Sequence, residues 1–295
     1  MDSSAEAADR RAPVSGIVYG MPNGDYHAMD ALGSSTLKRM AQSPFHAFKL
    51  GIDPARPVIP PTAAMAAGTL AHCAILEPDK LEERYTVRPA GIDGRTREGK
   101  AWILDNTHFG CEFVTEEQMQ TAMRQAAAVR QLPEVVSLLD GEGASEVSAF
   151  WTRDVIHADT GELEQIQCKC RPDRVCETED GQAVVLLDVK TAKQADADGF
   201  ARAIWNFRYD LQAAHYCDGF EKASGLMVLG MVFVVIESDY PHAAAAYILD
   251  DDAMTKARAE VSDLVGLYAR CQRTNTWPGY PNTVQPISLP AWAHR

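Results

Sequence analysis

Hydrophobic and polar positions follow a helical spacing through the first half of the chain. In "SSTLKRMAQSPFHAFKL" the apolar residues Leu37, Met40 and Ala41 recur at that spacing, and Ser34 is a candidate N-cap. A small-residue segment ending before a proline and a later amphipathic segment show the same signal. The helices predicted in this half cover residues 34–50, 62–77 and 115–132, with a polar, basic, glycine-containing loop at 88–101.

The pattern then changes to a period of two. The segments "EVSAFWTR" (146–153) and "ELEQIQCKCR" (162–171) alternate apolar and polar residues and are joined by the turn "HADTG". A second turn, "ETEDGQ", leads into the apolar run "AVVLLDVK" (183–190). Three strands joined by short turns predict an antiparallel meander.

Helical and strand patterns alternate in the last third of the chain. The predicted elements are a long helix over 197–222, strands over 226–237 and 243–250, a helix from about 251 to 271, and an irregular closing segment over 277–292. The expected fold class is therefore α/β, with a mixed central β-sheet flanked by α-helices.

Composition narrows this picture. The chain has 295 residues, of which 46% are hydrophobic, enough for a substantial core. We expect a disordered polar tail over residues 1–17 and a single domain over 18–295. The start of the chain has no apolar stretch typical of a secretory signal, and no window approaches the roughly 18 apolar residues of a membrane span.

Charge and cysteine content bear on location and partners. The seven cysteines are expected to be reduced thiols in a cytoplasmic protein, because "CKCRPDRVC" lacks the usual zinc or iron–sulfur spacing. A net charge of −13 argues against nucleic-acid binding, although it leaves room for a local basic groove.

A carboxylate and an ammonium close the apolar strand "VVLLDVKT". Alternation places Asp188 and Lys190 on the same face of the strand. Burying two charges costs free energy unless they pair with each other or another group in the site uses them. The same Asp/Glu-x-Lys pattern occurs at Glu98 and Lys100, in the polar loop, where a solvated charge cluster explains it. A surface ion pair at a strand end is the alternative for Asp188 and Lys190.

A second acid lies upstream, in "CRPDRV". If residues 163–175 and 183–190 form a hairpin, Asp173 can approach Asp188. Two crowded carboxylates repel each other, and a divalent cation between them would explain the pair. Mg²⁺ favours such oxygen ligands and keeps several waters.

Three further polar residues lie in predicted helices. Gln212 and Tyr216 are four residues apart and share one face of the long helix, where packing is the alternative role. His72 lies four residues after Gly68 in the small-residue helix, and the alternative for it is a hydrogen-bonded core histidine.

The ordered set of an upstream His in a helix, then Asp, then Asp-x-Lys, then Gln-x3-Tyr resembles the PD-(D/E)XK nuclease superfamily, in its RecB-like branch. The chain is most similar to the phage and prophage exodeoxyribonuclease VIII (RecE-type) nuclease domains. The matching pieces run from about residue 20 to the C-terminus. They include "YHAMDALGSSTLKRMAQSPFHAFK", "GTLAHCAILEPD", "GRTREGKAW", "CKCRPDRV", "LLDVKT", "DLQAAHY" and "WPGYPNTVQPISLPAWA".

The resemblance implies a restriction-endonuclease-like fold and a role for each matching residue. Asp173 and Asp188 would bind Mg²⁺, with Mn²⁺ as a substitute, and His72 would be a further ligand or its neighbour. Lys190 would be the catalytic lysine, while Gln212 and Tyr216 would brace the site and contact DNA. Glu146, expected to open the first meander strand, would line the site, and the basic loop residues Arg95, Arg97 and Lys100 would meet phosphates. The motif carries Asp rather than Glu before the lysine, and no iron–sulfur cluster is expected because the cysteine set of such members is missing.

The activity implied by the resemblance is 5′→3′ degradation of linear double-stranded DNA that leaves 3′ single-stranded tails. It also implies a ring-like homo-oligomer and a single-strand annealing recombinase as partner, with no membrane association. Two other functions stay open from the sequence. The chain could be a catalytically silent DNA-end-binding adaptor, or a RecB-like nuclease acting on single strands or as an endonuclease.

Overall fold

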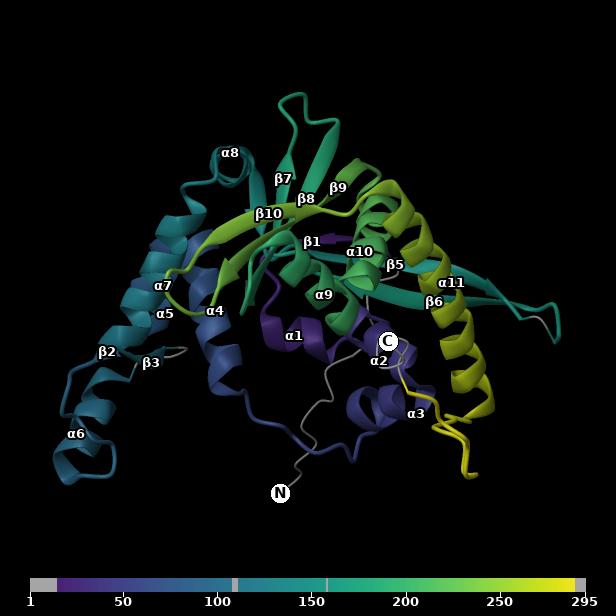
Figure 1. The fold of residues 1–295 in the computed structure, drawn as a ribbon, viewed down its shortest axis with the longest axis horizontal. Coiled ribbons are helices and arrows are strands. Elements are labelled where there is room, and N and C mark those ends of the chain that lie inside the picture. The colour runs from purple at the N-terminus through teal and green to yellow at the C-terminus, as the bar shows by residue number, and fades with distance from the viewer. Residues whose placement is uncertain (1–14, 108–110, 158, 290–295) are drawn as a thin grey trace, which may run out of the picture.

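A five-stranded mixed sheet forms the centre of the molecule in the computed structural model, which describes residues 15–107, 111–157 and 159–289 (Figure 1). The strand order is β10-β9-β8-β7-β4, with β8 and β9 parallel and the other pairs antiparallel. The strands are β4 (Gly143–Ser145), β7 (Arg174–Glu177), β8 (Ala183–Ala192), β9 (Met227–Glu237) and β10 (Ala244–Ile248). The expected α/β fold with a mixed central sheet is confirmed.

Two smaller sheets complete the β-structure of the described residues. An antiparallel sheet has the order β1-β5-β6, and a parallel pair joins β2 to β3. Their strands are β1 (Gly16–Val18), β5 (Ser148–Ile156), β6 (Leu163–Cys170), β2 (Tyr85–Arg88) and β3 (Glu112–Thr115). The β5–β6 hairpin extends beyond the helices on the right of Figure 1.

Helices cover both faces of the central sheet, and the alternation along β8 decides which residues face which helices. Leu187 and Val189 pack into a cluster with side chains from α4 (Ala63–Leu76), α7 (Glu116–Val129) and α8 (Pro133–Asp140). Leu186 belongs to the larger core cluster, which includes residues of α9 (Ala197–Phe207), α10 (Tyr209–Ser224) and α11 (Asp251–Thr274). Asp188 shares the Leu186 face and therefore lies toward α10.

The remaining helices are short and all lie before residue 107 in the sequence. They are α1 (Asn23–Ala28), α2 (Ser34–Gln42), α3 (Pro44–Ala47), the π-helical turn η1 (Phe48–Ile52), the 3₁₀ turn η2 (Pro78–Lys80), α5 (Leu81–Arg84) and α6 (Arg97–Asn106).

Several predicted boundaries are wrong for local reasons. The helix expected over 34–50 breaks at Ser43, whose hydroxyl accepts the His46 N–H to cap α3, and Gly33 rather than Ser34 is the N-cap of α2. The loop expected over 88–101 ends where Thr96 caps α6.

The helix expected over 197–222 is two helices. Arg208 has a left-handed backbone, with φ of 52°, and separates α9 from α10. Its guanidinium bonds the carboxylates of Asp210 (3.0–3.1 Å) and Glu260 (2.6–2.8 Å), so the strained residue is held by ion pairs.

The expected meander is also interrupted. The strand predicted over 162–171 ends at Cys170, and the chain resumes as β7 at Arg174 in a different sheet. The three residues between them include Asp173. The structure therefore places this acid in a link between sheets rather than inside a continuous hairpin strand.

The structure describes only part of the two predicted chain ends. Residues 1–14 of the expected tail lie outside the described residues, whereas Ile17 pairs with Ala149, so ordered structure begins before residue 18. The closing segment has no helix or strand in its described part, and Trp277 stacks on Phe48 at 5.4 Å.

Two other sequence predictions meet the structure here. All seven cysteines, each within the described residues, are free thiols. Every helix in the described part of the chain is too short or too polar to cross a lipid bilayer.

Candidate active site

The site is centred on the end of β8. Asp188 is 1% exposed, and one of its carboxylate oxygens forms an ion pair with the Lys190 ammonium. Alternation along the strand places the two side chains on one face, and both lie under the start of α10. The pair is therefore an interior feature, and the alternative of a solvated surface pair does not hold.

A chain of polar contacts fixes the other oxygen of Asp188. Gln212 Nε2 donates to Asp188 Oδ1 at 2.6 Å, and the Gln212 Oε1 accepts from Lys38 Nζ at 2.6 Å. Because the amide oxygen is held by an ammonium, the amide nitrogen has to point toward the carboxylate. Lys38, from α2, thus orients Gln212, which in turn orients Asp188.

Asp173 reaches the same place from the link before β7. Its Oδ2 accepts the Val189 backbone N–H at 2.7 Å and lies 3.4 Å from His72 Nδ1. Arg174 pairs with Leu187, so the register of β7 on β8 sets Asp173 beside the strand that carries Asp188. The structure brings together the two acids and the histidine predicted from sequence.

The tautomer of His72 follows from its partners. His72 Nε2 lies 2.8 Å from the Val189 carbonyl oxygen, which can only accept, so this nitrogen carries the proton. In the neutral ring, Nδ1 then presents a lone pair toward the Asp173 carboxylate. A lone pair facing a carboxylate is an arrangement that a proton or a cation between them would stabilise.

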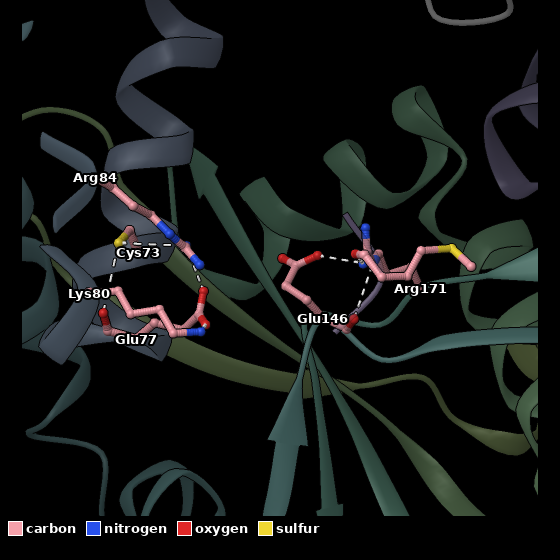
Figure 2. A network of polar contacts seen from close by, with 7 residues as sticks. Cys73, Glu77, Lys80, Arg84, Glu146 and Arg171 are labelled. Atoms are coloured by element: carbon pink, nitrogen blue, oxygen red, sulfur yellow. Dashed lines mark hydrogen bonds and ion pairs between the residues drawn. The ribbon is translucent and has the colours of Figure 1, made fainter. Parts of the chain in front are cut away.

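Glu146 adds a third acid at the edge of the site (Figure 2). It does not open the first meander strand as predicted, because its φ of 55° turns the chain before β5 begins at Ser148. The Glu146 N–H donates to the Asp173 carbonyl at 2.9 Å, and the Glu146 carbonyl accepts from Arg171 Nε at 3.0 Å. The Glu146 carboxylate lies 3.5 Å from the same guanidinium.

The electrostatics of these groups show an excess of negative charge. Burial raises the pKa of Asp173, and repulsion from Asp188 adds to the rise, while His72 opposes it. Burial and repulsion from Asp173 likewise raise the pKa of Glu146, against the opposing Arg171. Burial alone would lower the pKa of Lys190, but Asp188 and Asp173 outweigh it and the pKa is raised.

Two cavities adjoin residues of the site, and Gly68 of α4 lines both, whereas Asp173 and Asp188 line neither. The lysine-side cavity, of about 690 Å³, is lined by residues that include Lys190, Thr191, Arg202, Phe207 and Tyr209. The histidine-side cavity, of about 770 Å³, is lined by residues that include His72, Glu77, Arg84, Glu146 and Arg171. A Cβ at Gly68 would lie 3.6 Å from the Thr191 hydroxyl, which is an ordinary van der Waals contact.

On the histidine side, cations are already paired with acids. Glu77 Oε2 lies 2.6 Å from Arg84 Nη1, and Glu77 also bonds Lys80. Figure 2 shows this cluster across from Glu146 and Arg171. Because Glu77 is a single carboxylate shared by two cations, it balances only part of their charge.

The donor set fits a divalent metal ion that keeps several waters. Across the described residues, no three His, Cys, Asp or Glu side chains already stand together as a full ligand set. His72 Nδ1 and the Asp173 carboxylate nonetheless form a pair of donors, with Asp188 beside them. Burial first, and repulsion between the acids second, raise the pKa values of Asp173 and Glu146, and a bound cation would relieve both effects. Mg²⁺ is often held by one or two carboxylates and water, which matches this sparse set.

Tyr216 lies in the core behind the site. It is 8% exposed, with a hydrogen bond to Ser34, and burial together with the charges of Asp188 and Asp173 raises its pKa. The predicted basic residues lie elsewhere. Arg95 is exposed and pairs with Asp93 at 3.0 Å, while Arg97 and Lys100 belong to α6, at the lower left of Figure 1. Among the described residues, none of these three cations lines either cavity.

Sequence reasoning missed two residues of the site, Lys38 and Tyr209. The Tyr209 ring lies under both ammoniums, with Lys38 Nζ at 4.8 Å and Lys190 Nζ at 5.0 Å from its centroid. Tyr209 precedes Gln212 by three residues, so helical spacing could have placed it on the Gln212 face. Nothing local in the sequence marks Lys38, whose partner is 174 residues away.

Comparisons with known proteins agree with this geometry. Residues 33–289 match the model of a family described as a PDDEXK-like domain of unknown function (DUF3799). No curated protein matches the sequence. Among solved structures, a "putative exonuclease" from Eubacterium rectale aligns with 90% of this chain and 92% of its own at 14% identity and a TM-score of 0.54, which indicates a shared fold. Protein VC1899 from Vibrio cholerae aligns with 83% of this chain and 59% of its own at 12% identity, with a TM-score of only 0.19.

Proposed function

The chain belongs to the PDDEXK-like family, and from that premise we propose that it is a metal-dependent DNA nuclease. The observation that carries the proposal is the convergence of Asp173, Asp188 and His72 beside a buried Lys190. Such a group of acids with one amine suits hydrolysis of a phosphodiester, in which negative charge develops on phosphate and leaving oxygens.

Each side chain has a role that follows from its contacts. Asp173, Asp188 and the Nδ1 of His72 would hold Mg²⁺ or Mn²⁺, which when bound supplies a water of lowered pKa and positive charge opposite the phosphate. Lys190, whose raised pKa keeps it protonated, would offset charge on the phosphate and orient the attacking water. Gln212 holds Asp188 in place through its 2.6 Å hydrogen bond.

The finer activity we propose is that of an exonuclease on linear double-stranded DNA, working 5′→3′ and leaving 3′ single-stranded tails for recombination. The resemblance to RecE-type nuclease domains supports this, as does the fold shared with a protein named as a putative exonuclease. We also propose a ring-like homo-oligomer and a single-strand annealing partner. A ring would allow an acidic outer surface, expected from the net charge of −13, around a less acidic channel.

Linear duplex DNA labelled at the 5′ or the 3′ end tests the proposal, with Mg²⁺ or EDTA and with circular duplex as a comparison. We expect label from the 5′ end to be released first, only with the divalent ion, only from the linear form, and not by Asp188→Ala or Lys190→Ala. Equal release in EDTA or by these variants would contradict the mechanism.

Other outcomes identify the alternative functions. Cutting of the circle would indicate an endonuclease, and preference for single strands a RecB-like single-strand nuclease. Binding of DNA ends without hydrolysis, unchanged in Asp188→Ala, would indicate an adaptor.

A further inference from the structure

We propose that the lysine-side cavity binds an unpaired nucleotide of the cleaved strand, with its base stacked on Phe207. This inference rests on the proposed nuclease function and names what occupies the space beside Lys190.

The cavity is continuous with the candidate active site. Its wall includes Lys190 and Thr191 from the end of β8, the helix α4 on one side and α9 on the other. A nucleotide whose phosphate meets Lys190 would therefore extend its sugar and base into this space. A volume of about 690 Å³ lies within the range of about 300–1,000 Å³ typical of small-molecule pockets.

An open aromatic surface lines this cavity. The Phe207 side chain is 60% exposed, and its ring lies 5.6 Å from that of Tyr209 at an interplanar angle of 30°. Tyr209 in turn lies next to Lys190. The aromatic surface therefore runs from the catalytic lysine to an exposed ring, as on the stacking platforms that bind single-stranded nucleic acid.

A neighbouring aromatic residue provides a contrast on the same helix. Trp205 is 59% exposed, but it is not among the described residues that line the cavity. Its ring is covered instead by the Arg208 guanidinium at 5.3 Å and the Lys256 ammonium at 5.1 Å. Exposure alone therefore does not define the site, and Phe207 is distinguished by the cavity it faces.

The charge of the cavity suits a phosphate-bearing ligand. Besides Lys190, whose charge is paired with Asp188, its lining includes the cations Lys193 and Arg202 and a single carboxylate, Glu117, in a chain whose net charge is −13. Arg202 bonds the neutral Gln194 side chain at 3.3 Å, so its charge is not balanced by that contact. A cationic, aromatic space in an acidic protein favours a nucleotide over an uncharged ligand.

The base must be unpaired to use this surface. In a duplex both faces of a base are covered by neighbouring base pairs, so only a base that leaves the stack can lie on a protein ring. The proposal thus requires that the strand separates from its partner at the cleaved end.

The test places an abasic nucleotide at each of the last four positions of either strand of a linear duplex. Affinity is measured by fluorescence anisotropy with Ca²⁺ in place of Mg²⁺, and gels verify that the DNA stays intact. In the wild type, one position should weaken binding roughly tenfold when its base is removed, as expected for loss of one stacked base.

The variants decide whether Phe207 is the stacking partner. Phe207→Ala should bind the intact duplex less tightly and show no further loss at that position, whereas Phe207→Tyr should restore the wild-type pattern. Trp205→Ala, the matched control, should behave as the wild type.

The outcomes separate this inference from the proposed function. The inference would be overturned if Phe207→Ala kept the full loss of affinity at the abasic position, or if the wild type lost affinity at no position. In either case the proposed nuclease function would stand, provided that the wild type still hydrolyses DNA with Mg²⁺. Failure of the wild type to bind or cut any DNA would instead overturn the proposed function, and the inference with it.

Discussion

The two cavities that share Gly68 in their linings are similar in size and different in chemistry. The lysine-side cavity presents an exposed Phe207 and cations such as Arg202 that have no carboxylate in their observed hydrogen bonds. The histidine-side cavity presents Glu146 and the His72 imidazole, and its cations Arg84 and Arg171 form ion pairs with Glu77 and Glu146. The lysine-side lining has one carboxylate, Glu117, and its Arg202 bonds a neutral partner, whereas the histidine-side cations form ion pairs with acids.

This difference suggests that each side of the site binds a different ligand. A divalent ion would meet the unsatisfied acids on the histidine side, and a nucleotide would meet the cations and aromatic ring on the lysine side. Asp188 lies between them, bound to Lys190 by one oxygen and to Gln212 by the other. The comparison predicts that variants on the two sides fail in different ways.

The largest effect is expected from Asp188→Asn, which affects both sides at once. Removal of this charge should lower the rate of DNA hydrolysis by about a thousandfold, because the site would lose a group that supports electrostatic stabilisation of the transition state. It should also lower the pKa of Lys190, which Asp188 raises. Rates from end-labelled duplex test this, with Asp252→Asn, an exposed acid in the first turn of α11, as control. A rate within tenfold of the wild type would show that Asp188 is not central.

A smaller effect should come from Lys38→Met, because Lys38 acts through Gln212. Each of Lys38→Met and Gln212→Met should lower the rate roughly tenfold to a hundredfold, as is common for groups that orient a ligand. The double variant should be no slower than the slower single variant, since the two residues form one chain of contacts. Lys49→Met, an exposed lysine paired with Asp53, is the control, and additive losses in the double variant would contradict the relay.

The smallest effect concerns stability and pH on the histidine side alone. The pKa values of Asp173 and Glu146 are raised by burial in the folded state, so the folded chain binds these protons more tightly than the unfolded chain. Without divalent ions, the free energy of unfolding should therefore fall as pH rises from the ordinary carboxyl range through the raised values.

Urea unfolding across that pH range measures this slope. The double variant Asp173→Asn with Glu146→Gln should show a flatter decline than the wild type, and Phe207→Ala, on the other side, should parallel the wild type. A wild-type slope in the double variant would show that these acids are not under strain in the folded chain.

Much of the fold could be predicted because its signals are local. The period of two along β8 predicts a shared face for Asp188 and Lys190, and the structure has it. The helix over 62–77, which carries His72, ends before Pro78 as expected. Such features depend on the residues within one element and on backbone geometry.

The features that could not be predicted depend on contacts between distant residues. The break at Arg208 is held in part by Glu260, 52 residues away, and no local pattern indicates it. The link that carries Asp173 also carries Arg171, and both residues are held by hydrogen bonds with Glu146, which is 25 residues from Arg171 in the sequence. Lys38 and Gln212 meet only because α2 and α10 pack together. The sequence therefore indicates which groups form the site, and tertiary packing decides how they are oriented.

Binding of Mn²⁺, measured by isothermal titration calorimetry in the absence of DNA, tests the division of the site most directly. The account predicts that the wild type binds Mn²⁺, that Asp173→Asn abolishes this binding, and that Phe207→Ala leaves it unchanged. Equal Mn²⁺ binding by Asp173→Asn and the wild type would contradict the claim that a divalent ion is held on the histidine side.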